Sequence, residues 1–389
     1  MDFRLNEEQQ MLQDTVARLV RGEYSFEKRL AFSETDAGFS VDFWKQLSEL
    51  GLTAVPFPEE LGGFDGGGVE VQSVMTELGR GLCLEPYLQS VIFAGGLIGQ
   101  AGNDSQKETW LGGIASGELQ AAVALQEPQS FYNLNDVETR AEKKDGGYLL
   151  NGRKAVVIGG HCADVILVSA RTSGDTRDAS GISLFALKAD TAGIERRVYP
   201  TIDGSKGCDL TLNNVQVSAD ALLGDEDDAA NASHASHASR VIEYQSGRAI
   251  AALCAEAVGV MEVANELTLD YLKQRKQFGV PIGKFQVLQH RMVDMMSELE
   301  QARSMATLAA SVADEEQSDE RRRVLSAAKN VIGRSGQFIS EQGIQSHGGI
   351  GMTWEYNFAH YAKRLIMINH QLGDDDFHLE RYASLLQAG

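Results

Sequence analysis

Apolar residues recur at helical spacing through the stretch from Arg248 to Met295. They fall three or four positions apart, as on one face of an α-helix. The positions are Ile250, Leu253, Val258, Met261, Ala264, Leu267 and Tyr271. Pro281 interrupts the pattern because proline lacks an N–H and its ring clashes with the preceding helical turn. The pattern predicts a long helix, a turn, and a second helix that begins near Lys284.

Upstream of this stretch, the period of the apolar positions changes once. The chain begins with amphipathic helical patterns, the first of which starts after Asn6, a residue whose side chain can cap a helix. From about Leu119 the pattern becomes one of short β-rich runs bounded by glycine-containing turns. Asn151-Gly152 lies between two such runs and predicts a β-hairpin.

These periods predict an α+β multidomain protein, with helices at both ends of the chain and strands between them. The predicted units are a helical domain at 1–120, a β domain at 121–224, a linker at 225–240 and a second helical domain at 241–389. The linker contains His234 and His237, one helical turn apart, which could present two imidazoles to a metal. No third ligand is evident, so a solvated connector is favoured and no metal site is predicted.

Composition narrows the class of protein. The 389 residues are 43% hydrophobic, with 55 acidic and 35 basic side chains and a net charge of −20. Such a surface repels polyanions, so nucleic acid is an unexpected partner, and an anionic ligand would need a local basic pocket. The four cysteines lack CxxC spacing, the N-terminus lacks a signal-peptide pattern, and no apolar run is long enough to span a membrane. We expect a cytoplasmic protein.

Two segments carry a family resemblance. The run RKQFGVPIGKFQVLQHRMVDM, from Arg275 to Met295, and the segment from Gln345 to Arg364 resemble the signatures of acyl-CoA dehydrogenases. The resemblance implies the fold of that family, with an N-terminal helical domain, a middle β domain and a C-terminal four-helix bundle. It also implies FAD as cofactor, an acyl-CoA thioester as substrate, an electron-transfer flavoprotein as electron acceptor, and assembly as a dimer or tetramer.

The resemblance assigns cofactor-binding residues near the two signatures. Arg275 would neutralise the FAD pyrophosphate, and Phe278 would pack on a ring of the cofactor. Gln345 and the backbone at Gly348 and Gly349 would approach the phosphates, because glycine has no side chain to obstruct them. In the family, these groups reach the FAD of a neighbouring subunit.

Several positions depart from the family pattern. Only Glu127-Pro128 survives of the flavin-facing loop, and residues 155–158 lack the expected aromatic residue and threonine. The two usual positions of the catalytic base hold Gly373 and Ala249. Glu256, about two helical turns beyond Ala249, is the candidate base, whose task is to remove an α-proton.

Glu256 has an alternative interpretation, as a structural glutamate paired with an arginine or a backbone N–H, and the two are equally weighted. Asp374, Asp375 and Asp376 are a weaker alternative for the base and are favoured as a helix N-cap and solvated charges.

The departures resemble the small subunits of pimeloyl-CoA dehydrogenase and of heteromeric dehydrogenases that act on steroid side chains. The leading hypothesis is a subunit of an FAD-dependent acyl-CoA α,β-dehydrogenase, paired with a larger paralogous subunit. A second hypothesis is an autonomous homo-oligomer that uses Glu256. A third is a catalytically silent subunit that only completes the FAD site of its partner.

Overall fold

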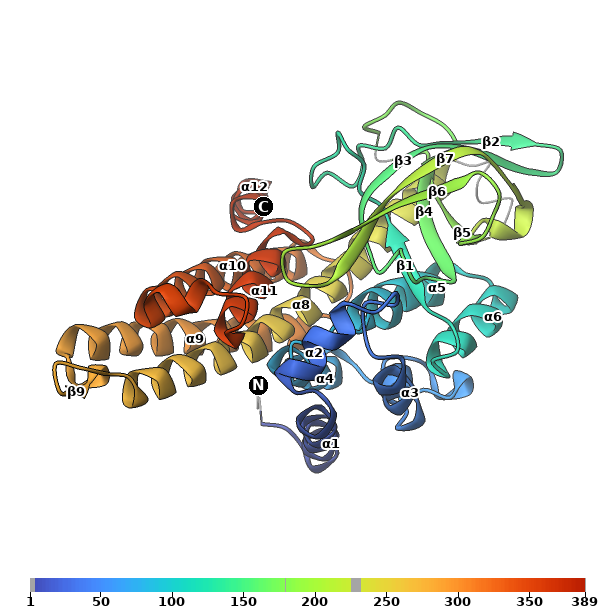
Figure 1. Cartoon of the computed structure of the whole chain (residues 1–389). Coiled ribbons are helices and arrows are strands. Elements are labelled where there is room, and N and C mark those ends of the chain that lie inside the picture. Colours follow the sequence, from blue (N-terminus) through green and yellow to red (C-terminus); the bar gives the residue numbers. More distant parts are fainter. Residues whose placement is uncertain (1–3, 179, 225–231, 389) are drawn as a thin grey trace.

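The computed structural model describes residues 4–178, 180–224 and 232–388. It has an N-terminal helical domain, a curled β sheet and a C-terminal set of long helices, as predicted (Figure 1). The sheet lies at one end of the molecule, and the long helices extend away from it to a distant tip that carries β9.

The N-terminal domain begins with a capped helix. Asn6 accepts a hydrogen bond from Gln9 N at 2.8 Å, which confirms the predicted cap of α1. The helices of the domain are α1 (Glu7–Glu23), α2 (Phe26–Ser33), α3 (Val41–Glu49), α4 (Gly68–Arg80), α5 (Gly95–Ala101) and α6 (Asp104–Ala115), with a π-helical turn, η3 (Leu88–Ala94), before α5.

The middle domain is one mixed sheet. Its strands are β1 (Ala121–Ala124), β2 (Arg140–Lys144), β3 (Gly147–Ile158), β4 (Val165–Arg171), β5 (Ile182–Lys188), β6 (Ile194–Pro200) and β7 (Lys206–Ser218). They run in the order β1-β4-β2-β3-β7-β6, with β5 paired to β4. Every residue of β4 is buried, because its alternating side chains enter two cores. Val165 and Leu167 pack with the helices, whereas Ile166 and Val168 fill the interior of the curled sheet.

The hairpin predicted at Asn151-Gly152 is wrong. Both residues lie inside β3, and the turn between β2 and β3 is at Asp145-Gly146 instead. Gly152 marks a register shift between β3 and β7, and a Cβ there would lie 2.3 Å from Thr139 Oγ1. The glycine is therefore required for close packing within the sheet and not for a turn.

The C-terminal domain is built on α8 (Ala232–Gln274), which begins inside the predicted connector. The predicted turn at Pro281 is confirmed, as the two-residue strands β8 (Lys276–Gln277) and β9 (Val280–Pro281) form a small hairpin there. The helices that follow are α9 (Gln286–Val312), α10 (Asp319–His347), α11 (Asn357–His370) and α12 (Asp375–Ala388).

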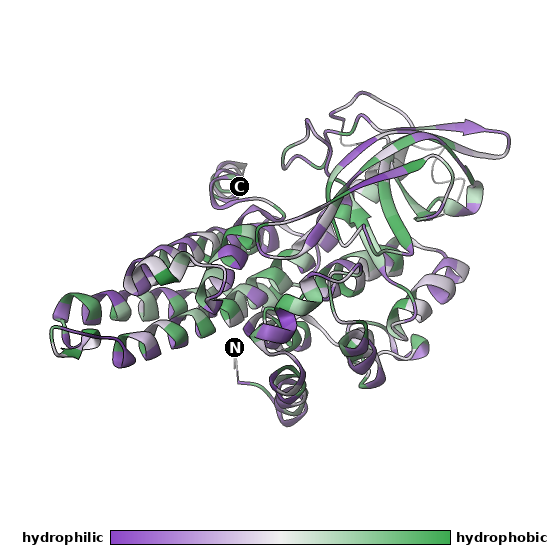
Figure 2. Cartoon of the chain, in the orientation of Figure 1, coloured by the Kyte–Doolittle hydropathy of each residue, from purple (hydrophilic) through white to green (hydrophobic). Residues whose placement is uncertain are grey.

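Close helix packing joins the two helical domains. A Cβ on Gly79 of α4 would lie 2.2 Å from Glu256 O, and one on Gly259 of α8 would lie 2.0 Å from Thr76 O. Glycine at both positions therefore lets the two backbones touch. Figure 2 shows apolar residues along the inner faces of these helices, and one continuous core unites them with the near side of the sheet.

Candidate functional site

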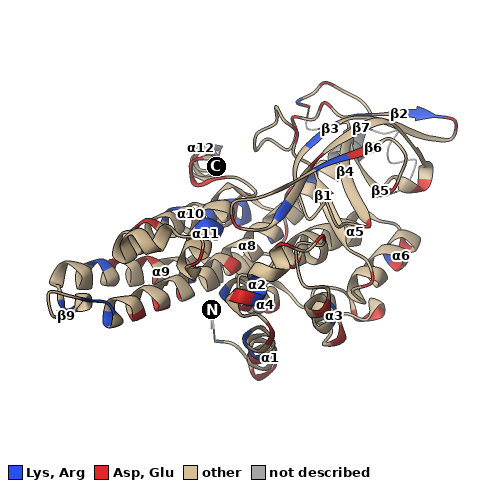
Figure 3. Cartoon of the chain, in the orientation of Figure 1, with Lys and Arg blue, Asp and Glu red and all other residues tan. Residues whose placement is uncertain are grey.

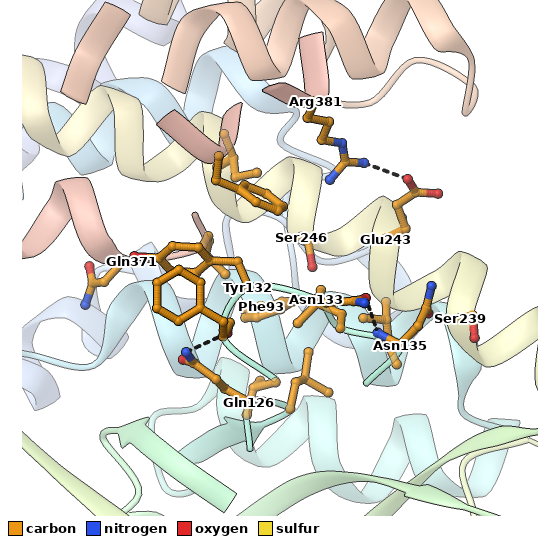
Figure 4. Close-up of a pocket in the computed structure, with 18 of the residues that line it drawn as sticks. Phe93, Gln126, Tyr132, Asn133, Asn135, Ser239, Glu243, Ser246, Gln371 and Arg381 are labelled. Carbon is orange, nitrogen blue, oxygen red and sulfur yellow. Dashed lines mark hydrogen bonds and ion pairs between the residues drawn. The ribbon is translucent and has the colours of Figure 1, made fainter. Parts of the chain in front are cut away.

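A cavity of about 800 Å³ lies where the sheet meets the helices. Its wall combines η3, the loop after β1, the end of β3, the first part of α8, and segments of α10 and α12. Figure 4 shows Phe93 of η3, Tyr132 and Asn133 of the loop after β1, and Ser246 of the first part of α8 around this space. Because all three domains contribute to it, the cavity is the candidate binding site.

One wall of the cavity comes from a distorted part of β3. The register between β3 and β7 shifts between Lys154 and Val157, as at a β-bulge. Val156 has a φ of +54° and lines the cavity together with Ala155 and Ile158. A β-branched residue in this conformation is strained, and such strain concentrates at binding sites. The bulge thus presents short aliphatic side chains where the family resemblance places an aromatic residue and a threonine.

Glu127 anchors the loop after β1. Its carboxylate accepts Lys154 Nζ at 2.6 Å and the backbone N–H of Glu138 at 2.7 Å, all in a buried setting. Burial would raise the pKa of Glu127, but the Lys154 charge and these donors hold it below its usual range. Burial lowers the pKa of Lys154 to about 8 in spite of this partner. The surviving Glu of the family loop therefore fixes the loop and does not face the cavity.

The tip of this loop reaches the C-terminal helices. Tyr132 packs its ring against Phe377, with centroids 5.4 Å apart, and its hydroxyl lies 3.4 Å from His370 Nδ1. Phe131 beside it has a φ of +52°, and its carbonyl accepts a hydrogen bond from Gln126 Nε2 at 2.7 Å (Figure 4). The phenol ring of Tyr132 thus forms part of the cavity wall. The sequence analysis missed this contact, although Phe131-Tyr132 is an aromatic pair in an otherwise polar loop.

The segment at Gly373, a usual position of the family base, is tightly held. Buried Lys329 donates to Asn369 O at 2.8 Å and to Gly373 O at 2.6 Å, and His378 Nε2 donates to Leu372 O at 2.9 Å. Gly373 has a φ of +102°, and a Cβ there would lie 2.5 Å from Phe377 Cδ1. A glutamate at this position would be strained by the left-handed φ and would press on the Phe377 side chain, so this backbone conformation disfavours a base here.

Glu256 lies in a buried charge network outside the large cavity. Arg364 binds it through Nε at 2.6 Å and Nη2 at 2.7 Å, and also binds Asp203 through Nη1 at 2.9 Å. The two carboxylates raise the pKa of Arg364 against its burial. Both oxygens of Glu256 therefore have a cationic partner, as the structural interpretation expects. Its role as a base stays a prediction.

The other candidate bases have structural partners. Asp374 accepts a hydrogen bond from Phe377 N at 2.8 Å at the start of α12, and Asp375 accepts one from Asn369 Nδ2 at 2.9 Å. Among the described residues no group of three or more metal-ligating side chains exists. His237 is exposed, and the His234 side chain lies outside the described residues.

The predicted cofactor-binding residues lie on two segments away from the cavity, the hairpin at the far tip (Figure 1) and the end of α10. Arg275 and Phe278 adjoin the β8–β9 hairpin, whereas Gln345 and the Gly348-Gly349 turn end α10. Tyr271 and His347, whose rings lie 4.6 Å apart, hold the two segments side by side. Arg275 and Gln345 are exposed, Phe278 is 92% exposed, and a Cβ on either glycine would meet nothing within 4 Å.

The tip is also apolar. Large exposed hydrophobic side chains lie along the first turns of α9 and on the segment after α10; they are Phe285, Val287, Val293, Met296, Ile350 and Met352. A surface of this kind is typical of a protein–protein contact. In Figure 3 acidic and basic residues are mixed along the helices, without a broad basic face.

The tip and the large cavity therefore differ in how well their residues fit the parts of an FAD molecule. At the tip, an exposed guanidinium, an exposed aromatic ring and two unobstructed glycines suit an adenosine diphosphate group. In the cavity, the buried Ser246 Oγ and Gln371 Oε1 have no hydrogen-bond partner among the described residues, which fits a polar ligand. The positions that would face a flavin ring, however, hold Val156 and Ile158, and they do not fit that group.

Comparison with known proteins places the chain in a family. It matches the N-terminal domain of acyl-CoA dehydrogenases at residues 6–118, the middle domain at 122–215 and the C-terminal domain at 240–385. It is 30% identical over 362 residues to the probable acyl-CoA dehydrogenase YngJ of Bacillus subtilis (strain 168), with 92% of each chain covered.

Solved structures agree. One chain of the ChsE4-ChsE5 complex from Mycobacterium tuberculosis is 25% identical, with a TM-score of 0.88 and full coverage of both chains. A variant of the steroid ACAD Tcur3481-Tcur3483 is 27% identical, with a TM-score of 0.86 and 98% coverage of each chain. This chain thus belongs to the acyl-CoA dehydrogenase family of flavin-dependent oxidoreductases, as its two signatures predict. No helix among its described residues is long and apolar enough to cross a membrane.

Proposed function

We propose that this chain is one subunit of an FAD-dependent acyl-CoA α,β-dehydrogenase and that it completes the FAD site of a neighbouring, larger paralogous subunit. Arg275, Phe278, Gln345, Gly348 and Gly349 would hold the adenosine diphosphate part of that FAD. When bound, FAD supplies the hydride acceptor for desaturation of the thioester. An electron-transfer flavoprotein is the proposed acceptor of the electrons, by analogy with the family.

The observation that carries this proposal is the separation of the two half-sites. Ile250 of α8 lines the cavity, whereas Arg275 follows the end of the same helix. The 24 residues between Ile250 and Gln274 span about 36 Å of helix, at about 1.5 Å per residue. A single FAD cannot join the tip and the cavity of one chain across that distance. On this proposal the tip serves a second chain, and the exposed apolar surface around it is suited to contact one.

The cavity of this chain supports the role of a contributing subunit. Its flavin-facing positions are aliphatic, Tyr132 crosses to the C-terminal helices, and the backbone at Gly373 disfavours a base. An autonomous homo-oligomer with Glu256 as base is the second candidate. In its favour, Glu256 lines a small chamber next to the cavity.

The experiment measures flavin per chain. The tagged chain is purified from its own cells with its co-purifying subunits, and separately after expression alone. We expect FAD in the complex and none in the chain alone. Arg275→Met should remove most of the FAD from the complex, whereas Arg18→Met, an exposed arginine on α1, should not.

Two outcomes would contradict the proposal. Stoichiometric FAD in the chain alone, bleached by an acyl-CoA, would favour the homo-oligomer. Full FAD retention by the Arg275→Met complex would show that the tip does not hold the cofactor.

A further inference from the structure

A small polar chamber of about 40 Å³ lies next to the large cavity. Leu88, Gln89 and Ile158 line both spaces, so they form the wall between them. A space of this size holds a water or a single polar group but not a larger one. The chamber therefore lies directly behind this part of the cavity wall.

Glu85 is the first polar group of the chamber. It is 7% exposed, and its Oε1 accepts a hydrogen bond from Ser40 N at 3.1 Å. Its Oε2 is buried without a hydrogen-bond partner among the described residues, although the Tyr24 hydroxyl lies nearby and accepts from Leu84 N. Burial raises the pKa of Glu85 to about 7. The carboxyl therefore retains an unused hydrogen-bonding oxygen inside the protein.

His161 supplies the second unused atom. Its Nε2 donates to Ala37 O at 2.8 Å, because a carbonyl can only accept. Burial lowers the pKa of His161, so the ring is neutral and its Nδ1 carries no proton. Nδ1 is buried and has no partner among the described residues. Leaving a polar atom unpaired costs about 1–3 kcal/mol, so these two atoms point to a polar occupant.

The charges around the chamber limit the kind of occupant. Arg364 is bound by Glu256 and Asp203, and Lys206 Nζ donates to the carbonyl of Thr35 at 2.5 Å. Both cations that line the chamber thus have other partners, while Glu85 adds an acid. A terminal carboxylate would find no cation reserved for it, and a terminal methyl would leave both acceptors unpaired. A hydroxyl group satisfies both atoms. It donates to His161 Nδ1, and it accepts from the Glu85 carboxyl when that carboxyl is protonated.

We propose that the chamber binds a hydroxyl group at the far end of an acyl chain whose thioester end lies in the large cavity. The ligand class of this cavity is accordingly a hydroxylated acyl-CoA, and Glu85 is the residue that selects it. This inference goes beyond the proposed function, because it adds that an acyl-CoA lies in the cavity of this chain.

The test compares acyl-CoA thioesters matched in length, with 6 to 16 carbons, that end in a hydroxymethyl or a methyl group. Calorimetry measures their Kd for the complex purified from its own cells. At one chain length we expect the hydroxyl form to bind about tenfold more tightly, as for one buried hydrogen bond of about 1.4 kcal/mol. Glu85→Leu should abolish the preference, whereas Glu85→Gln, which keeps a carbonyl oxygen, should retain part of it.

Glu77→Gln is the matched control, because Glu77 is also buried with a raised pKa but faces a different groove. It should leave the preference unchanged, and thermal melting checks that each variant is folded. Equal binding of both forms at every length, unaffected by Glu85→Leu, would overturn the hydroxyl site and leave acyl-CoA binding intact. Tighter binding of a carboxyl-terminated chain would also overturn it. Absence of binding by any thioester would overturn the proposed function as well.

Discussion

At the scale of single residues, the function of a carboxylate depends on its partners. Glu256 and Glu85 are both buried, yet they differ in what they contact. Both oxygens of Glu256 accept hydrogen bonds from the Arg364 guanidinium, whereas Glu85 retains an oxygen without a partner among the described residues. A paired carboxylate stabilises the fold, and an unpaired one is free to recognise a ligand.

Glu256→Gln separates structure from catalysis. Removing one charge from this buried network should lower the free energy of unfolding by about 3 kcal/mol, since Arg364 would lose its closest partner. If Glu256 is only structural, turnover per folded complex should stay within about twofold. Denaturant melts and steady-state rates measure the two effects.

The control is Glu320→Gln, which breaks an exposed pair with Arg323 and should change stability by less than about 0.5 kcal/mol. A loss of turnover of about a hundredfold or more in a folded Glu256→Gln complex would instead identify the base.

Glu85 should make stability depend on pH. Its pKa is raised from 4.5 to about 7, so the folded state holds its proton more strongly than the unfolded chain does. The stability that this carboxyl contributes is complete below pH 4.5 and is lost as the pH rises through 7. The raised pKa of Glu85 corresponds to about 3 kcal/mol in the free energy of unfolding.

Denaturant melts from pH 4 to 8 check this expectation. The difference in unfolding free energy between wild type and Glu85→Gln should change by about that amount across the range. The titration of His161 contributes equally in both proteins, so it cancels in the difference. Tyr24 and Cys83, whose pKa values are raised, stay neutral from pH 4 to 8. A difference that is flat with pH would contradict the buried, unpaired state of Glu85.

At the scale of elements, two loops shape the cavity. The loop after β1 is fixed at its base by Glu127 and extends Tyr132 to α12, and the segment between α11 and α12 is fixed by Lys329. A buried ionisable residue holds each loop. Glu127 pairs with the charge of Lys154, and Lys329 donates to the backbone carbonyl of Gly373. Because the loops are rigid, the cavity is preformed, as is usual for a small-molecule site.

Gly373→Ala should be costly. The left-handed φ and the contact with Phe377 both oppose a side chain, so we expect a loss of about 2–4 kcal/mol in unfolding free energy. Gly112→Ala is the control, because Gly112 lies in α6 with open space around it and should gain up to about 1 kcal/mol. Thermal melts compare the two. If Gly373→Ala is as stable as wild type, the backbone does not disfavour a base at this position.

At the scale of the whole molecule, the long helices separate the cavity from the tip. The tip combines exposed residues that we propose bind FAD with an apolar surface, and nothing in the same chain covers it within the part that the structure describes. Such a surface is stabilised by contact with a second chain.

Met352→Asp should weaken assembly. Met352 is 69% exposed in this patch, and a charge there would be desolvated on contact with a partner. We expect a smaller mass in light scattering at micromolar protein and a loss of FAD from the complex. Met11→Asp is the control, since Met11 is 63% exposed on α1, away from the tip. An unchanged mass for Met352→Asp would exclude this patch from the interface.

The sequence by itself determined the family, the three successive folding units and the long helix, because these follow from local periodicity and from two contiguous signatures. The apolar stripe of α8 is buried through Ala264 as its spacing predicts. The glycine at position 373, where the resemblance places a family base, can also be read from the sequence, and the absence of a base there stays a prediction.

Only the tertiary structure decided what each polar side chain contacts. Arg364 is 108 residues from Glu256, and His161 is 76 residues from Glu85, so no local pattern relates them. The Asn151-Gly152 hairpin failed for the same reason, because long-range packing against Thr139 outweighed a local turn preference. The sequence specifies which groups are available, and packing decides which are paired, which are strained and which are left to meet a ligand.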